Sequence, residues 1–252
     1  MAERYASLKQ GLVGCWIPSV SGSGFLLPDL SGYGNHGTLT DMASDDWVSA
    51  QYGRALDFDG TNDYVVASDR HLPTGDATIT LSHWLNLKNT STPSGVFGYG
   101  ATASALTSMK SIINVVSGQV WLAFAGGNNA RGPTLQANKW YHVCFVKTPG
   151  AINTTTKIYL DGNLQAIGAG SSTSIPSITL SSVTFGVFDL PSNDFAPIFL
   201  DDCRIYNRAL SESEIRLLAS RPGIGLRQDR DRQTFYQTNT RAQNHSLISN
   251  MF

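Results

Sequence analysis

The sequence predicts an all-β protein, a sandwich of two antiparallel sheets, and three observations lead to this fold class. Short segments alternate apolar and polar residues with a period of two. Turn-forming clusters such as GGNN, TPG, LDGN and LPSND separate these segments. Only 15% of the residues are charged, whereas Gly, Ser, Thr and Asn are plentiful, which favours turns and sheet edges over long solvated helices.

The expected strands follow one another along the chain. In residues 77–87, ATITLSHWLNL, apolar side chains such as Leu81 and Leu85 share one face, and polar ones such as Thr80 and Asn86 share the other. His83 falls on the apolar face and is interpreted as a core histidine. Asp161-Gly162 predicts a hairpin turn, because Gly accepts a positive φ. Further strands are expected over residues 119–125, 139–146, 156–160, 183–188 and 197–206.

One short helix and a tail are expected after the last strand. Ser211 and Glu214 form a capping box and Pro222-Gly223 ends the periodic stretch, so the helix is predicted over residues 212–219. Residues 221–252 contain five Arg, two Asp and no periodic apolar pattern, which indicates an extended tail rather than a second domain. The predicted organisation is an N-terminal arm (1–10), one sandwich domain (11–220) and an Arg-rich tail (221–252).

Three stretches carry a family resemblance: GLVGCWIP leading to DLSGYGNHGTL, then YGRALDFDGTNDYVVAS, then LDDCRIYNRALSESEI. KWYHVCFV and KIYLDGN support it. Over residues 10–220 their order and spacing resemble the laminin G-like branch of the concanavalin A-like lectin/glucanase superfamily, in its phage and bacterial form. The resemblance implies a concanavalin A-like jelly roll, a scaffold that hosts lectins, glycosidases, adhesion modules and virion proteins.

Composition argues against several classes of partner. A formal net charge of −1 gives no basic field for nucleic acid or an anionic membrane. No stretch approaches the length of a membrane-spanning helix, and the polar N-terminus lacks the apolar run of an export signal. Cys15, Cys144 and Cys203 lie far apart with no CxxC pair, so neither a disulfide framework nor a zinc site is indicated.

The sequence leans against an enzyme. Glycosidases usually need two carboxyl groups that flank the sugar bond. The three glutamates, Glu3, Glu212 and Glu214, lie outside the expected strands, and the ExDxxE motif of the catalytic glucanases is absent. The five histidines form no HExxH motif, and no GxSxG motif occurs. We therefore expect a binding or structural protein.

Calcium is the chemistry best supported by the DLSGYGNHG segment. Asp29, Ser31 and Asn35 supply oxygen ligands among three glycines, which allow carbonyl groups to converge on a hard cation. In similar family members such a loop is joined by an acidic residue of the last strand, which here would be Asp201 or Asp202. The resemblance thus implies a calcium site shared by the loop and the strand.

A structural interpretation of the same residues stays open. If Cys203 and Ile205 point inward, Asp201 shares their face, and an inward carboxylate needs a cation or hydrogen-bond donors. The loop side chains would then only organise Asx turns, and the strand carboxylates would pair with Arg204, Arg208 or backbone amides.

Aromatic side chains near loops are the candidates for stacking on sugar rings. Tyr33, Tyr99 and Trp121 lie closest to loops or to solvent-facing positions and are predicted to bind a ligand. The other tryptophans of the expected strands are assigned to the core: Trp16, Trp47, Trp84 and Trp140.

These observations, with the resemblance, predict a non-enzymatic virion structural protein, a capsid decoration or tail-associated protein assembled in the host cytoplasm, whose loops contact glycans. The termini are expected to bind other virion proteins in a homo-oligomer or a larger assembly. The alternative is an extracellular, calcium-dependent carbohydrate-binding or adhesion module without a virion role. The predicted partner-binding residues of the tail are Arg221, Arg227, Arg230, Arg232, Phe235 and Tyr236.

Overall fold

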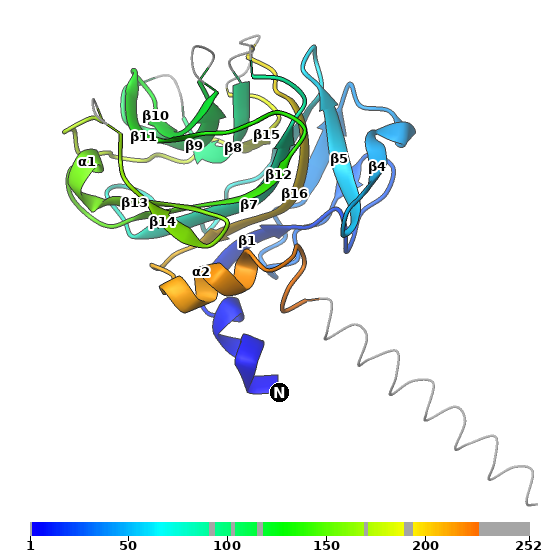
Figure 1. The fold of residues 1–252 in the computed structure, drawn as a ribbon, viewed down its shortest axis with the longest axis horizontal. Coiled ribbons are helices and arrows are strands. Elements are labelled where there is room, and N and C mark those ends of the chain that lie inside the picture. The colour runs from blue at the N-terminus through cyan, green and yellow to red at the C-terminus, as the bar shows by residue number, and fades with distance from the viewer. Residues whose placement is uncertain are drawn as a thin grey trace, which may run out of the picture.

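The computed structural model of the protein describes residues 2–90, 94–101, 104–114, 118–168, 171–188 and 194–226. In these residues two antiparallel sheets of eight strands each pack face to face (Figure 1). The predicted jelly-roll sandwich is therefore confirmed. The first sheet runs in the order β14 (Asn163–Gln165), β13 (Thr156–Leu160), β12 (Trp140–Lys147), β7 (Ile79–Leu87), β16 (Pro197–Tyr206), β5 (Gly53–Asp59) and β4 (Trp47–Ala50), with β1 (Leu12–Trp16) also paired to β16.

The second sheet closes the sandwich from the other side. Its order is β11 (Asn128–Thr134), β10 (Gln119–Phe124), β9 (Ser108–Ile113), β8 (Ser94–Gly100), β15 (Val183–Phe185), β6 (Tyr64–Ala67), β3 (Gly37–Thr40) and β2 (Leu26–Leu27). The short helical elements are η1 (Ala2–Lys9), η2 (Ser44–Asp46), α1 (Ile152–Thr155) and α2 (Glu212–Leu218). No helix in the described part of the chain is long and apolar enough to cross a membrane.

Helix α2 begins where the sequence predicts. The Ser211 Oγ atom accepts a hydrogen bond from the Glu214 backbone N–H at 3.3 Å, and the Ser211 N–H donates to the Glu214 carboxylate at 2.9 Å. This reciprocal capping box satisfies two backbone donors that a helix start leaves open. The predicted helix is thus confirmed to within one residue at its end.

The main core lies between the two sheets, and the alternation along β7 shows how it forms. Leu81 and Leu85 are fully buried against the second sheet. His83 lies between them, with its Nε2 atom 2.9 Å from the Ser111 Oγ atom. Burial lowers the pKa of His83 to about 3, so the ring is neutral at pH 7. The interpretation of His83 as a core residue is confirmed.

A second, smaller core covers the outer face of the first sheet. Ile215 of α2, Leu8 of η1 and Ile224 pack there against β-strand residues such as Cys144 and Tyr206. Figure 1 shows α2 and η1 on this side of the sheet, next to β1. The packing of this second core extends past the predicted boundaries at residues 10 and 220. Leu8 and Ile224 are 1% and 3% exposed, so the segments that hold them belong to the domain.

A β-bulge in β16 corrects the predicted orientation of Asp201. Asp202 has a φ of 48°, and the register along β7 shifts between Asp201 and Arg204. The extra residue interrupts the alternation, so Asp201 and Arg204 both lie on the outer face whereas Cys203 points into the main core. The expectation that Asp201 shares the face of Cys203 is therefore wrong.

Candidate functional site

A groove of about 290 Å³ opens on the outer face of the first sheet. One side is lined by β4 and by Gln51 of the turn that joins β4 to β5. The floor comes from β12, β7 and β16. The residues that line the groove are Val48, Ser49, Ala50, Gln51, Asn86, Trp140 and Phe199.

The floor of the groove belongs to one row of side chains that crosses four strands and continues past the groove to Asp57 of β5. Asn86 of β7 is the register partner of Trp140 on β12 and of Phe199 on β16. Phe199 in turn pairs with Asp57 on β5. Residues opposite one another in antiparallel strands share a face, so these four side chains all lie on the outer face of the sheet. We name this set, Trp140, Asn86, Phe199 and Asp57, the groove row.

The groove row combines aromatic surface with polar groups. Trp140 is half-buried and lines the groove. The Asn86 Oδ1 atom is buried and has no hydrogen-bond partner among the described residues. An unpaired buried acceptor is costly unless water or a ligand hydroxyl donates to it. The Asp57 carboxylate pairs with the ammonium group of Lys88 at the end of the row.

Trp140 is the groove-lining residue that sequence reasoning missed, because it was assigned to the core. The signal was present in the alternation of β12. Tyr141, Val143 and Phe145 point into the main core, so Trp140, one position earlier, points outward.

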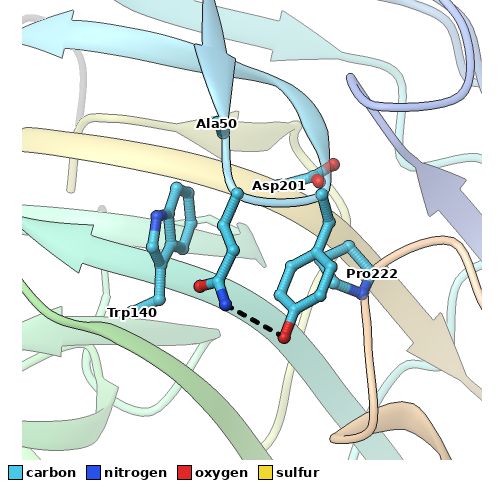
Figure 2. A pocket seen from close by; sticks show the side chains of 6 residues that line it. Ala50, Trp140, Asp201 and Pro222 are labelled. Atoms are coloured by element: carbon cyan, nitrogen blue, oxygen red, sulfur yellow. Dashed lines mark hydrogen bonds between the residues drawn. The ribbon is translucent and has the colours of Figure 1, made fainter.

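A smaller space of about 10 Å³ adjoins the groove and shares Ala50, Gln51 and Trp140 with it. Figure 2 shows Trp140 on one side of this space and Asp201 and Pro222 on the other. The Gln51 side-chain amide donates to the Tyr52 hydroxyl at 3.3 Å across it.

Asp201 is buried beside this smaller space. Its Oδ1 atom accepts from the backbone N–H groups of Ser19 at 3.2 Å and Asp202 at 2.8 Å. Burial is the main cause that raises the pKa of Asp201 to about 7, and the neighbouring Asp202 carboxylate adds to it. Asp201 thus holds a proton more readily than an ordinary carboxyl group.

Asp29, the centre of the predicted calcium loop, organises a turn. Its Oδ1 atom accepts from the backbone N–H groups of Cys15 at 3.0 Å and Ser31 at 2.9 Å. Its Oδ2 atom accepts from the Ser31 hydroxyl at 2.8 Å and the Asn35 N–H at 3.0 Å. Both oxygens therefore already hold two donors each, and an ion would have to replace some of them.

The acidic residues of β16 also have protein partners. Asp202 forms a bidentate ion pair with Arg204, at 2.5 Å to Nε and 3.0 Å to Nη2, and accepts the Gly223 N–H at 2.7 Å. The structural interpretation predicts such pairing of the β16 carboxylates with arginine and backbone amide groups. Across the described ranges no group of three or more His, Cys, Asp or Glu side chains is placed to hold a metal ion. The shared calcium site stays a prediction.

Removal of calcium tests that prediction directly. The calcium hypothesis predicts that EDTA lowers the melting temperature, and that excess CaCl₂ restores it, because an ion bound only to the folded state stabilises it. The Asp29→Asn variant should then lose the response to EDTA. An equal melting temperature of the wild-type protein in calcium-free and calcium-containing buffer rejects the hypothesis.

The three predicted ligand-binding aromatic residues are not brought together. Tyr33 is 47% exposed and contacts the His71 ring, with 5.4 Å between the ring centroids. Trp121 is half-buried on the second sheet, with the Arg131 guanidinium group 4.9 Å from its ring centroid. The prediction for Tyr99 is wrong, because its side chain is fully buried in the main core and its hydroxyl donates to the Pro73 carbonyl at 2.8 Å.

The predicted partner-binding residues lie mostly beyond the described part of the chain. Arg221 is half-buried at the start of the segment that joins the second core. The others lie outside the described residues: Arg227, Arg230, Arg232, Phe235 and Tyr236.

The family model described as the concanavalin A-like lectin/glucanases superfamily matches residues 59–216. The chain belongs to this superfamily. The resemblance predicted from sequence is thus confirmed. No curated protein sequence matches the chain.

Solved structures share the superfamily's sandwich. Domain 4 of AbnA, an extracellular arabinanase from Geobacillus stearothermophilus solved in complex with arabinotriose, is 20% identical with a TM-score of 0.63, over 82% of this chain and 98% of that one. A Trypanosoma rangeli sialidase in complex with sialic acid is 18% identical with a TM-score of 0.57, over 83% of this chain. The botulinum neurotoxin serotype D binding domain is 16% identical with a TM-score of 0.59, over 84% of this chain and 52% of that one.

This chain spans 32% of the sialidase chain, whereas it covers nearly all of the arabinanase domain. At identities of 16–20% the likeness shows the fold alone.

Proposed function

We propose that this protein is a non-enzymatic carbohydrate-binding module whose glycan site is the groove on the outer face of the first sheet. The groove row is the observation that carries the proposal. Trp140 and Phe199 offer apolar ring surface to the C–H faces of a sugar, and Asn86 offers an acceptor to a hydroxyl group. A concave site with mainly apolar lining and a few polar groups is typical of small-ligand recognition.

The groove volume suggests contact with a short part of a glycan. About 290 Å³ lies near the lower end of the range of small-molecule pockets, roughly 300–1,000 Å³. The polar lining residues Ser49 and Gln51 come from the β4–β5 hairpin, and the aromatic ones come from the floor. A sugar ring stacked on the floor would therefore present its hydroxyl groups to the hairpin. The arabinotriose complex of the arabinanase domain supports a carbohydrate ligand on a sandwich of this kind.

The carboxyl groups near the groove favour binding over hydrolysis. Glycosidases of the common type place two carboxyl groups on either side of the bond that breaks. Asp57 is held in an ion pair with Lys88, and Asp201 is buried with backbone N–H donors on its Oδ1 atom. Neither group is a free carboxyl side chain facing the other across the groove.

A glycan array is the direct test. The full chain should bind one or more oligosaccharides on an array of plant, animal and bacterial-surface glycans, without releasing shorter sugars on incubation. Absence of binding to every glycan would overturn the proposed function, and release of reducing sugar would show an enzyme instead.

The virion role, with assembly in the host cytoplasm and glycans of the host surface as ligands, stays a prediction from sequence. Because Ile224 packs into the second core, a truncation should begin after Leu226 rather than at residue 221. The virion hypothesis predicts that a chain ending at Leu226 keeps its melting temperature but no longer associates with phage particles. Association retained by the shortened chain contradicts it.

A further inference from the structure

Lys88 and Asp57 form an ion pair at the end of the groove row. The Lys88 ammonium group contacts the Asp57 Oδ1 atom and lies 5.0 Å from the centroid of the Phe199 ring. Lys88 follows Asn86 by two positions along the chain, and its backbone N–H continues the pairing with β16 by donating to the Pro197 carbonyl at 2.9 Å. Its side chain therefore emerges on the same face as the groove row.

The ion pair is partly accessible to a ligand in the groove. The side chains of Lys88 and Asp57 are 28% and 24% exposed. Phe199, which lies beneath the Lys88 ammonium group, also lines the groove. A sugar stacked on Phe199 would therefore lie close to both charged groups.

The pair decides which charge the groove presents. A lysine over an aromatic ring, without a counter-ion, would attract a carboxylate or sulfate through charge-assisted hydrogen bonds. Here the Asp57 carboxylate occupies that position, cancels the positive charge and repels a second anion. None of the side chains that line the groove is charged, so no other lining residue replaces the lost attraction.

We infer that Asp57 sets the preference of the groove for neutral over acidic glycans by holding Lys88 in this ion pair. The inference rests on the proposed function, because it concerns the ligand of the same groove. It makes Asp57 a specificity-determining residue, and it makes Lys88 a latent anion-binding group.

The test compares wild type with Asp57→Asn on an array that holds neutral oligosaccharides and their sialylated or uronic-acid counterparts on the same cores. Wild type should prefer the neutral member of each pair. Asp57→Asn keeps the shape of the side chain and removes its charge, so affinity for the acidic member should rise about tenfold and should fall again at high salt. The double variant Asp57→Asn/Lys88→Gln should lose this gain.

Glu212→Gln is the matched control. Glu212 forms an exposed ion pair with Arg216 on α2, and its replacement changes the net charge by the same amount without touching the groove. An equal gain in this control, or a wild-type preference for acidic glycans, overturns the inference. The inference is also overturned if wild type binds neutral glycans and Asp57→Asn keeps the same preference for neutral over acidic glycans. In that case the proposed function still holds. Wild-type protein that binds no glycan at all overturns both.

Discussion

Replacement of Trp140 by alanine is expected to weaken glycan binding by at least about thirtyfold while the sandwich stays folded. Truncation of a central aromatic residue in a binding site typically costs about 2 kcal/mol or more, which corresponds to this factor. Trp140 supplies the largest ring of the groove row, and it lines both the groove and the smaller space beside it. Isothermal titration with the strongest glycan from the array measures the change, and a thermal melt checks the fold.

Trp121→Ala is the matched control for this variant. Trp121 is also a half-buried tryptophan of a strand, but it lies on the second sheet beneath Arg131. Its truncation should leave glycan affinity within about twofold of wild type, since effects beyond the contact area are small. Lost binding in Trp121→Ala together with normal binding in Trp140→Ala would move the site to the second sheet and to Trp121, one of the ligand-binding residues predicted from sequence.

Replacement of Arg204 by alanine is expected to lower the free energy of unfolding by about 3–5 kcal/mol, because it leaves the buried Asp202 carboxylate without its counter-ion. Arg204 is 1% exposed, and its guanidinium group holds the Asp202 carboxylate and donates to the Ile224 carbonyl at 2.9 Å. Without Arg204, Asp202 keeps only the Gly223 N–H among these contacts. The second core would lose one of the two hydrogen-bonded links named here between residues 221–226 and β16, the one from Arg204 to the Ile224 carbonyl.

Urea denaturation measures this loss, and Arg216→Ala provides the comparison. Arg216 forms an exposed ion pair with Glu212 on α2, and exposed pairs contribute at most about 1 kcal/mol. Arg216→Ala should therefore remain close to wild type. A loss below about 1 kcal/mol in Arg204→Ala would contradict the role assigned to the buried pair.

Local patterns in the sequence were enough to predict the sandwich. The alternation around His83 correctly gave the face that points into the main core, and the capping box at Ser211 correctly gave the start of α2. Both signals depend on residues a few positions apart, so they can be recognised without any knowledge of the tertiary structure.

The parts that sequence reasoning missed depend on contacts between distant segments. Leu8 and Ile224 stand among polar or turn-forming residues, and only the fold brings them together beneath α2. The bulge at Asp202 adds one residue to β16, and the sequence has no glycine there that would indicate it. The extra residue puts Asp201 on the opposite face of the sheet from the one expected. The groove row likewise comes from four strands. It could be predicted only from the register between these strands, which the sequence of one segment does not determine.

The second core has a mechanical consequence. Gly225 lies against Tyr5 and Leu8, so the two ends of the folded unit meet on one side of the sandwich. Tension applied between these ends would first separate η1 from residues 221–226 and only later reach the β1–β16 pairing. A module tethered at both ends would thus yield at a small peripheral contact while its strands stayed paired under load.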